Sequence, residues 1–233
     1  MSHSNDDIEK VFQEIADYTF RDIGFLEEDV KIKVALRILR CLGYRDTDLS
    51  FEHSGIDIFV RGPSKETCII VETKKLGENL EKHLPQMKRY MEKKHALLGI
   101  LTNGDEFRIF ACSVDMPLCK IYRRDLARKE NIETLQHLFS REALSTEEKI
   151  LTNINEEFTR RAEALKYKLK LANDMMKAIK SKDSKKLEEL TSEARKAGVN
   201  LYLDLEEAEG LLKSWTKLTE NIRKLTARVQ SQI

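Results

Sequence analysis

The stretch CIIVETKKLG, residues 68–77, decides how the first part of the chain folds. Four apolar residues lead directly into Glu72, Thr73 and Lys74, and the chain then turns at Gly77. A continuous apolar run of this length is typical of a strand that is covered on both faces. Residues two apart in a strand share a face, so the pattern predicts a buried central strand from whose end Glu72 and Lys74 project together while Thr73 points away.

Helical and strand patterns alternate around this stretch. Apolar spacing predicts, in order, helices over 7–19 and 25–42, strands over 56–60 and 68–73, a helix over 80–94, and two strands that flank residues 103–104. Gly43 is a plausible C-terminal stop for the second helix. Asn103-Gly104 is the dipeptide that best supplies the positive φ angles of a tight hairpin turn. The order predicts an α/β domain with its central strand at residues 68–73.

Beyond about Ser140 strand signals largely disappear, and helical spacing takes over. A short helical piece, 185–197, is closed by Gly198 and lies between two segments with apolar residues at alternating spacings of three and four. Those residues are Ala162, Leu165, Leu169, Ala172, Met176 and Ile179, and then Ala208, Leu211, Trp215, Leu218, Ile222, Leu225 and Val229. We therefore expect an α/β domain over 1–140 and a helical hairpin or bundle over 141–233. The apolar residues named above would form the seam of this helical domain, either within one chain or with a second copy in a homodimer or higher oligomer.

Composition indicates a soluble protein of a reducing compartment. Charged residues make up 35% of the 233 and hydrophobic ones 41%, and the N-terminus carries neither an apolar signal region nor an Arg-rich transit pattern. No run approaches the roughly 18 apolar residues that a membrane span requires. Cys41, Cys68, Cys112 and Cys119 stand singly without a CxxC pair, which favours small core residues over a zinc site or disulfides. A cytoplasmic location without membrane contact is expected.

The acids at the strand ends carry the chemistry. Asp57 stands in the middle of the apolar segment 56–60, where an unpaired charge would be costly. Two acids and a lysine at the ends of adjacent strands can form a site for a hard cation. Asp57, Glu72 and the carbonyl of Thr73 would offer oxygens to Mg²⁺ or Mn²⁺, and Lys74 would orient a water or stabilise charge on a phosphate.

Four motifs in order carry a resemblance to a known family. GIDIF followed by ETK resembles the acid and Glu-x-Lys pattern of the PD-(D/E)xK nuclease superfamily, with Ile before Asp57 in place of Pro. EEDVKIKVALRILRCLGY looks like the helix of the N-terminal nuclease domain of type I restriction enzyme R subunits. QMKRY, with Gln86 and Tyr90, resembles the Gln-x-x-x-Tyr motif on the helix after the catalytic strand, and GILTNGDEFRIF matches a Leu-Thr-Asn-Gly hairpin of these domains. The resemblance covers residues 27–111.

The resemblance implies a restriction-endonuclease-like fold, with a mixed central sheet flanked by helices. It also implies a metal-dependent endonuclease acting on DNA, in microbial defence or DNA processing and with a helicase or other defence protein as a possible partner. In that family a helix glutamate completes the metal site, and Glu27, on the core-facing stripe with Val30, is favoured over Glu28. The chain lacks the GxxxxGK motif of a helicase, so type I restriction by this chain alone is excluded.

Simpler roles remain open for each of these residues. Asp57 is then a strand-end acid that caps a turn, Glu27 is a first-turn acid that favours the helix dipole, and Gln86 and Tyr90 are packing and surface residues. Two other functions also remain open. One is a catalytically silent nucleic-acid-binding or scaffold protein that recruits a partner through its helices. The other is a ribonuclease that uses the same site.

A basic segment in the second domain is a candidate surface for nucleic acid. Residues 159–186 contain ten Lys and Arg against three acids, whereas the part before Arg141 has 22 against 24. The candidate contacts to phosphate are Lys75, Arg160, Arg161, Lys166 and Lys170. Lysines at such positions on a helix also commonly form a solvated face, and that interpretation stays open.

Overall fold

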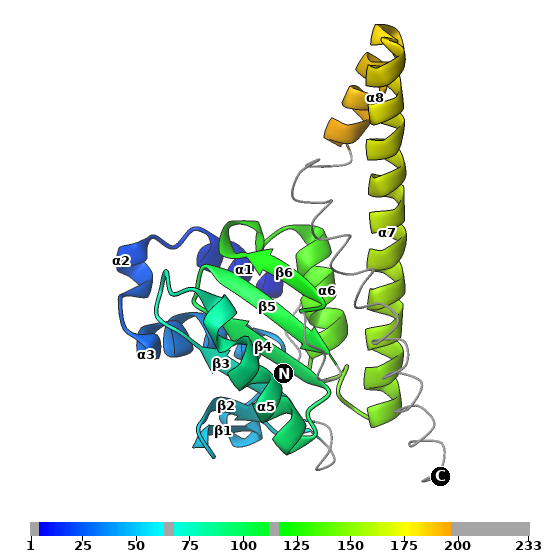
Figure 1. Cartoon of the computed structure of the whole chain (residues 1–233). Helices are drawn as coiled ribbons and strands as arrows, with labels where there is room; N and C mark the ends of the chain where they lie inside the picture. The colour runs from blue at the N-terminus through cyan, green and yellow to red at the C-terminus, as the bar shows by residue number, and fades with distance from the viewer. Residues whose placement is uncertain (1–4, 63–67, 112–116, 197–233) are drawn as a thin grey trace. The chain divides into compact units, whose positions relative to one another are not determined.

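A six-stranded sheet organises the first part of the chain in the computed structural model, which describes residues 5–62, 68–111 and 117–196 (Figure 1). The strands are β1 (Leu49–His53), β2 (Ile56–Val60), β3 (Ile69–Thr73), β4 (Leu98–Thr102), β5 (Glu106–Ala111) and β6 (Cys119–Tyr122). They lie in the sheet in sequence order. Only β3 and β4 pair in parallel, and the other neighbours pair antiparallel. The expected mixed sheet is confirmed, with β3 in its interior and every residue of β3 buried.

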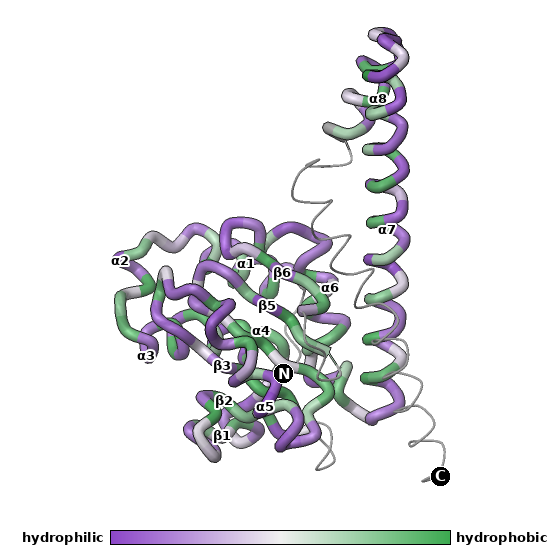
Figure 2. The backbone as a smooth tube through the Cα atoms, in the orientation of Figure 1, coloured by the Kyte–Doolittle hydropathy of each residue, from purple (hydrophilic) through white to green (hydrophobic). Residues whose placement is uncertain are grey.

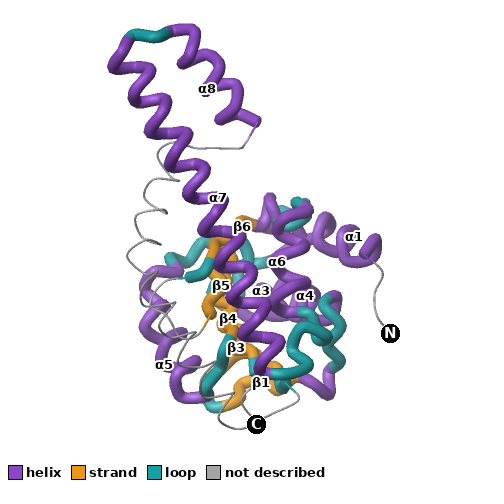
Figure 3. Tube along the Cα trace, turned by 90° about the vertical axis from the view of Figure 1, so that its right-hand side faces the viewer, coloured by secondary structure: helices purple, strands orange, loops and turns teal. Residues whose placement is uncertain are grey.

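Helices cover both faces of this sheet. They are α1 (Asn5–Ala16), α2 (Phe20–Ile23), α3 (Glu27–Val30), a π-helical segment (Lys31–Ala35), α4 (Leu36–Cys41), α5 (Leu84–Lys94) and α6 (Lys129–Phe139). Single 3₁₀ turns span Asp46–Asp48, Leu80–His83 and Arg123–Asp125. Figure 3 shows α5 on one side of the strands and α1, α3, α4 and α6 on the other. The flanking helices inferred from the family resemblance are therefore present.

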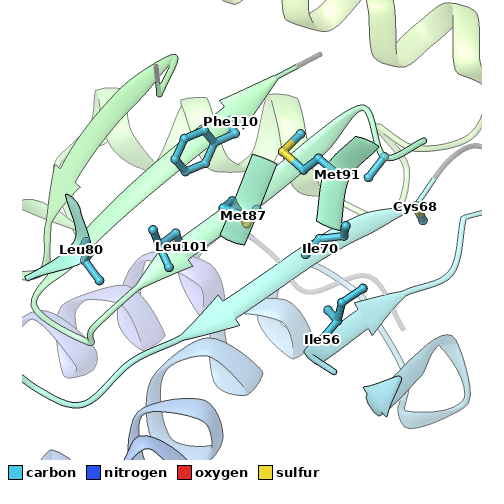
Figure 4. Close-up of a cluster of buried hydrophobic side chains, with 9 residues drawn as sticks. Ile56, Cys68, Ile70, Leu80, Met87, Met91, Leu101 and Phe110 are labelled. Atoms are coloured by element: carbon cyan, nitrogen blue, oxygen red, sulfur yellow. The ribbon is translucent and has the colours of Figure 1, made fainter. Parts of the chain in front are cut away.

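The connection from β3 to β4 runs through α5, as parallel strands require. Met87 and Met91 of α5 pack onto Ile70 of β3 and Leu101 of β4 (Figure 4). A Cβ on Gly99 would lie 2.1 Å from Met87 Cε and 3.0 Å from Met91 Sδ. The absence of a side chain at Gly99 thus lets the helix pack close to the sheet.

Several elements differ from the sequence predictions. The segment 48–62 forms a β-hairpin, β1–β2, because Ser54 and Gly55 adopt φ angles of 59° and 83° and reverse the chain. The predicted helix over 25–42 is interrupted by its π-helical segment. Strand β6 and helix α6 were not predicted. In the β4–β5 hairpin only Gly104 takes a positive φ, +82°, whereas Asn103 supports the turn with its side chain.

Three of the cysteines, Cys41, Cys68 and Cys119, are buried and free, in agreement with the role of core residues. Cys112 lies outside the described residues. None of the helices within the described ranges is long and apolar enough to cross a membrane.

A second compact unit begins at Glu156, within α7 (Glu147–Ser181), and includes α8 (Ser184–Lys196). The two helices form a hairpin held by Leu171, Met175 and Ala178 of α7 and by Leu190 and Ala194 of α8. The α7 tube in Figure 2 changes repeatedly between purple and green, as an amphipathic helix does. The predicted helical hairpin is therefore confirmed, while the domain boundary at residue 140 stays a prediction.

The phase of the predicted seam is wrong by one residue at this end of α7. Met176 and Ile179 were expected in the seam, but they are 54% and 56% exposed. Their neighbours Met175 and Ala178 are buried against α8 instead. The second predicted seam segment, from Ala208 to Val229, lies outside the described residues.

Candidate active site

Glu72 is the centre of the candidate site. It is the penultimate residue of β3 and only 2% exposed. Its Oε1 accepts a hydrogen bond of 2.9 Å from Lys74 Nζ and one of 2.7 Å from Gln86 Nε2. Glu72 and Lys74 thus lie together at the end of the strand, as the sequence pattern predicted.

Lys74 connects β3 to α3. Its ammonium, buried with the rest of the side chain, also donates to Glu27 Oε1 at 3.1 Å. Burial alone would lower the pKa of Lys74, but its hydrogen bonds and charge interactions with Glu72 and Glu27 raise it above the ordinary value, so the amine stays protonated. Glu28 binds Lys31 at 2.7 Å. The structure thus brings Glu27, the glutamate that the sequence favours, to the site.

Asp57 enters from the neighbouring strand β2. Ile58 pairs with Val71 in the antiparallel register, which places Asp57 beside Glu72. Asp57 Oδ2 accepts hydrogen bonds from the backbone N–H of Thr73 at 2.6 Å and from its hydroxyl at 2.8 Å. Thr73 was expected to point away from Glu72 and Lys74, and its hydroxyl instead has a partner of its own in Asp57, a contact that the sequence analysis did not predict.

The ionised form of Glu72 is disfavoured by its surroundings. Burial, followed by the nearby charge of Asp57, raises the pKa of Glu72 to about 7, and the hydrogen bond from Lys74 offsets part of this effect. Glu72 Oε2 is buried and has no hydrogen-bond partner among the described residues. A buried carboxylate oxygen without a donor is costly, so this atom is a position at which a cation would be stabilised.

Gln86 and Tyr90, at i and i+4 on α5, lie together as the Gln-x-x-x-Tyr motif implies. The amide nitrogen that donates to Glu72 lies 3.2 Å from Tyr90 Oη. A Cβ on Gly55, in the β1–β2 turn, would lie 3.2 Å from the same hydroxyl. Tyr90 thus lies between Gln86, which contacts Glu72, and the β1–β2 hairpin that carries Asp57.

Lys31 is a site-neighbouring residue that the sequence analysis did not single out. It is 7% exposed, and its Nζ lies 2.7 Å from Glu28 Oε2 and 2.5 Å from Glu52 Oε1. These two acids and the more distant charge of Asp57 raise its pKa against the effect of burial. The only signal in the sequence was its place as the basic residue of the EEDVK motif.

The β4–β5 turn supports α3 from the other side. Asn103 Oδ1 accepts hydrogen bonds from the N–H groups of Asp105 and Glu106, at 3.0 and 2.8 Å. Gly104 faces Val30, since a Cβ there would lie 3.2 Å from Val30 Cγ2. Val30 is three residues after Glu27, so the hairpin motif and the helix motif meet in the structure.

The donor set suits a hard cation only in part. Among the described residues, no group of three or more His, Cys, Asp or Glu side chains is arranged to hold a metal ion. Asp57 and Glu72 do form an adjacent buried acid pair, with Glu72 Oε2 unpartnered, and carboxylate oxygens are the ligands that Mg²⁺ prefers. These two residues fit one divalent ion. Glu27 is held by Lys74, and its metal role and that of the Thr73 carbonyl stay predictions.

The candidate nucleic-acid contacts divide into two groups. Lys75 follows Lys74 at the end of β3 and is exposed. In the second unit, Arg160 and Arg161 both bind the buried carboxylate of Glu157, at 2.7 and 2.6 Å. Those interactions lower the pKa of Glu157 although burial alone would raise it.

The remaining two candidates, Lys166 and Lys170, are exposed on α7. The structure therefore leaves the roles of all five basic residues as predictions.

The mixed sheet, the Glu-Thr-Lys sequence at the end of its central strand and the second acid on the adjacent strand agree with the restriction-nuclease-like domain that the sequence resemblance implied. Residues 8–120 match the family model described as type I restriction enzyme R protein N terminus, and this match confirms the sequence resemblance. No curated protein and no solved structure matches the chain.

Proposed function

We propose that this chain is a Mg²⁺-dependent endonuclease that hydrolyses DNA phosphodiester bonds. The observation that carries the proposal is the convergence of four separate elements on Glu72. Lys74 and Gln86 donate to Glu72, Glu27 accepts from Lys74, and the charge of Asp57 acts on Glu72. These residues are far apart in sequence, yet they meet at one buried carboxylate. Such a convergence supports a functional site more strongly than a single ion pair would.

Asp57 and Glu72 would hold the Mg²⁺ or Mn²⁺, with the Thr73 carbonyl as a further oxygen. Bound there, the ion would supply Lewis acidity and a water of lowered pKa. Lys74 has three N–H donors, two of which point to Glu72 and Glu27. Its third donor is available to orient an attacking water or a phosphate oxygen. Gln86 fixes the rotamer of Glu72, and Thr73 fixes that of Asp57.

The test is nicking of supercoiled plasmid DNA in Mg²⁺ or Mn²⁺. We expect the native chain to nick the plasmid, EDTA to stop the reaction, and Asp57→Asn and Lys74→Met to abolish it. Lys10→Met, which removes an exposed lysine on α1, is the matched control and keeps activity. Circular dichroism verifies that each variant is folded. Nicking that survives in both site variants would show that another protein or another site cuts the DNA.

A second candidate function has an observation of its own. Lys74 is bound by Glu72 and Glu27 at once, an arrangement in which an ammonium group neutralises the acids without a metal. The chain would then be a silent nuclease-fold protein that binds nucleic acid and recruits a partner through its helices. Binding of DNA without cleavage in any divalent metal supports this candidate. Cleavage of single-stranded RNA with duplex DNA left intact would instead support the ribonuclease alternative.

The proposed biological setting follows from the family. Type I restriction enzyme R proteins imply a role in microbial defence, with DNA and a restriction-modification or helicase protein as partners. One site cuts one strand, so double-strand cleavage needs two copies or two encounters, and the C-terminal helices are the proposed means of dimerisation. Sedimentation velocity of the whole chain and of a variant ending at residue 140 tests that assignment.

A further inference from the structure

The segment that contains α5 has an excess of positive charge that the domain as a whole lacks. Residues 75–94 contain six Lys and Arg side chains against three Glu. Each of the three acids already has a side-chain partner. Glu78 lies 2.8 Å from His83, Glu81 lies 2.7 Å from Arg108, and Glu92 lies 4.0 Å from Lys88. The local acids therefore do little to neutralise the rest of the segment.

Four exposed cations of this segment form no ion pair with any described residue. Lys75, Lys82, Arg89 and Lys93 are exposed, and within the described ranges no acidic side chain lies at ion-pairing distance from them. Elsewhere in this domain some exposed cations are paired, for example Arg40 with Asp46 and Arg128 with Asp125. Those with no ion pair among the described residues, such as Lys10, Arg21 and Lys120, are spread over α1, α2 and β6. Unpaired cations gathered on one segment make a positive surface that attracts an anion.

This surface is continuous with the candidate site. Gln86, Arg89, Tyr90 and Lys93 lie at i, i+3, i+4 and i+7, which is one face of α5, while the opposite face is buried against the sheet. The Arg89 guanidinium lies over the Tyr90 ring, 5.6 Å from its centroid. Because the Gln86 amide contacts both Tyr90 and Glu72, Arg89 is separated from the buried carboxylate by only two side chains.

Lys75 adds a positive charge beside Lys74, which it follows directly after the end of β3. We propose that the exposed face of α5, defined by Arg89 and Lys93, together with Lys75, is the surface that binds the phosphate backbone of duplex DNA and leads it to Glu72. This inference rests on the proposed nuclease function and assigns its substrate-binding surface. It places that surface in the nuclease-like domain instead of on α7, where Glu157 already binds both Arg160 and Arg161.

The experiment is fluorescence anisotropy of the whole chain with a labelled DNA duplex in EDTA, over a series of salt concentrations. Arg89→Gln/Lys93→Gln removes two charges while keeping good helix formers. Each lost phosphate contact lowers the slope of log K against log salt by about 0.9, so the pair lowers it by about 1.8 and weakens binding at about 0.1 M salt by tenfold or more. Arg89→Lys/Lys93→Arg keeps the charges and keeps the slope.

Two further pairs control for net charge and for location. Lys120→Gln/Lys129→Gln removes two exposed charges from β6 and α6, at the far edge of the sheet, and leaves binding nearly unchanged. Lys166→Gln/Lys170→Gln tests α7 in the same way. Equal losses from all pairs, a larger loss from the α7 pair, or a native chain that binds no duplex DNA would overturn the proposal. A preference for an RNA duplex of the same length would reassign the surface to RNA.

The outcome is separable from that of the proposed reaction. Binding without metal does not depend on turnover, so a silent chain whose affinity still falls with Arg89→Gln/Lys93→Gln keeps this inference and loses the nuclease. In the opposite case, nicking depends on Asp57 and Lys74, but Arg89→Gln/Lys93→Gln binds DNA as tightly as the native chain. That result would support the nuclease function and overturn the proposed binding surface.

Discussion

Asp57 and Thr73 are joined by two hydrogen bonds, one of 2.6 Å from the backbone N–H and one of 2.8 Å from the hydroxyl, both to Asp57 Oδ2. Thr73 is fully buried and Asp57 nearly so. The contact joins the start of β2 to the end of β3 and leaves Oδ1 free of any hydrogen bond from the described residues. The same carboxylate therefore has a structural oxygen and an oxygen available to a ligand.

Replacing Asp57 with alanine should lower the free energy of unfolding by about 1–3 kcal/mol, because the buried N–H and hydroxyl of Thr73 lose their acceptor. Asp57→Asn should cost less, since an amide oxygen can accept the same bonds. Urea unfolding of both variants in EDTA measures the difference. Equal losses for alanine and asparagine would mean that the charge of Asp57, and not its hydrogen bonds, stabilises the sheet.

Local periodicity predicted part of this site, and the part that depends on neighbouring strands was missed. Glu72 and Lys74 share a face because they are two apart in one strand, which the sequence shows directly. The bond from the Thr73 hydroxyl depends on how β2 pairs with β3, which brings Asp57 to the end of β3. No single segment contains that information.

Two other differences have physical causes of the same kind. Of the β1–β2 hairpin only the strand over 56–60 was predicted, because the turn before it needs a positive φ at Ser54, a residue that rarely adopts one. The α7 seam was displaced by one position because Met175 and Met176 are equally apolar, and only the packing of α8 selects Met175. The family motifs, in contrast, led to Gln86 and Tyr90, which propensity alone would have left as surface residues.

The raised pKa of Glu72 predicts a pH dependence of stability in the metal-free chain. Its ordinary value is 4.5 and its folded value is about 7, so between these values the folded state binds more protons than the unfolded state. The free energy of unfolding should therefore fall as pH rises from about 4.5 to 7, by about 3 kcal/mol at most. Glu72→Gln cannot titrate, so its stability should fall less over the same interval. Urea unfolding at several pH values measures this change. An equal fall in the free energy of unfolding for the native chain and Glu72→Gln would contradict the raised pKa of Glu72.

Divalent metal should reverse that loss. Mg²⁺ that binds Asp57 and Glu72 stabilises the folded state, by about 1.4 kcal/mol when the metal is at about ten times its Kd. Thermal melting at about pH 8 with and without the metal measures the shift in Tm, since this pH lies above the pKa of Glu72. Glu72→Gln should lose most of the shift, whereas Glu28→Gln, whose carboxylate binds Lys31, should keep it. An equal shift in Glu72→Gln would place the ion elsewhere.

Gln86 should act as a positioning residue for Glu72. Gln86→Ala removes the 2.7 Å hydrogen bond to Oε1 and should lower metal affinity or activity by about 10- to 100-fold, as loss of an outer partner does at metal sites. Tyr90→Phe keeps that bond and removes only the hydroxyl beside Gln86, so its effect should be smaller. Mn²⁺ titration gives a reading independent of turnover. A Tyr90→Phe loss equal to that of Gln86→Ala would show that the hydroxyl takes part directly.

The β4–β5 turn offers a matched test of how α3 is held. Gly104 and Gly77 have nearly equal φ angles, +82° and +80°, but a Cβ on Gly104 would lie 3.2 Å from Val30 Cγ2, whereas one on Gly77 would meet nothing within 4 Å. Both substitutions to alanine carry the backbone cost of a positive φ, about 1 kcal/mol. Only Gly104→Ala also presses on α3, so it should destabilise the chain more in urea and weaken metal binding by displacing Glu27 relative to Lys74. If Gly77→Ala has the same two effects, strain in the turns is sufficient to explain them and the contact with Val30 does not position Glu27.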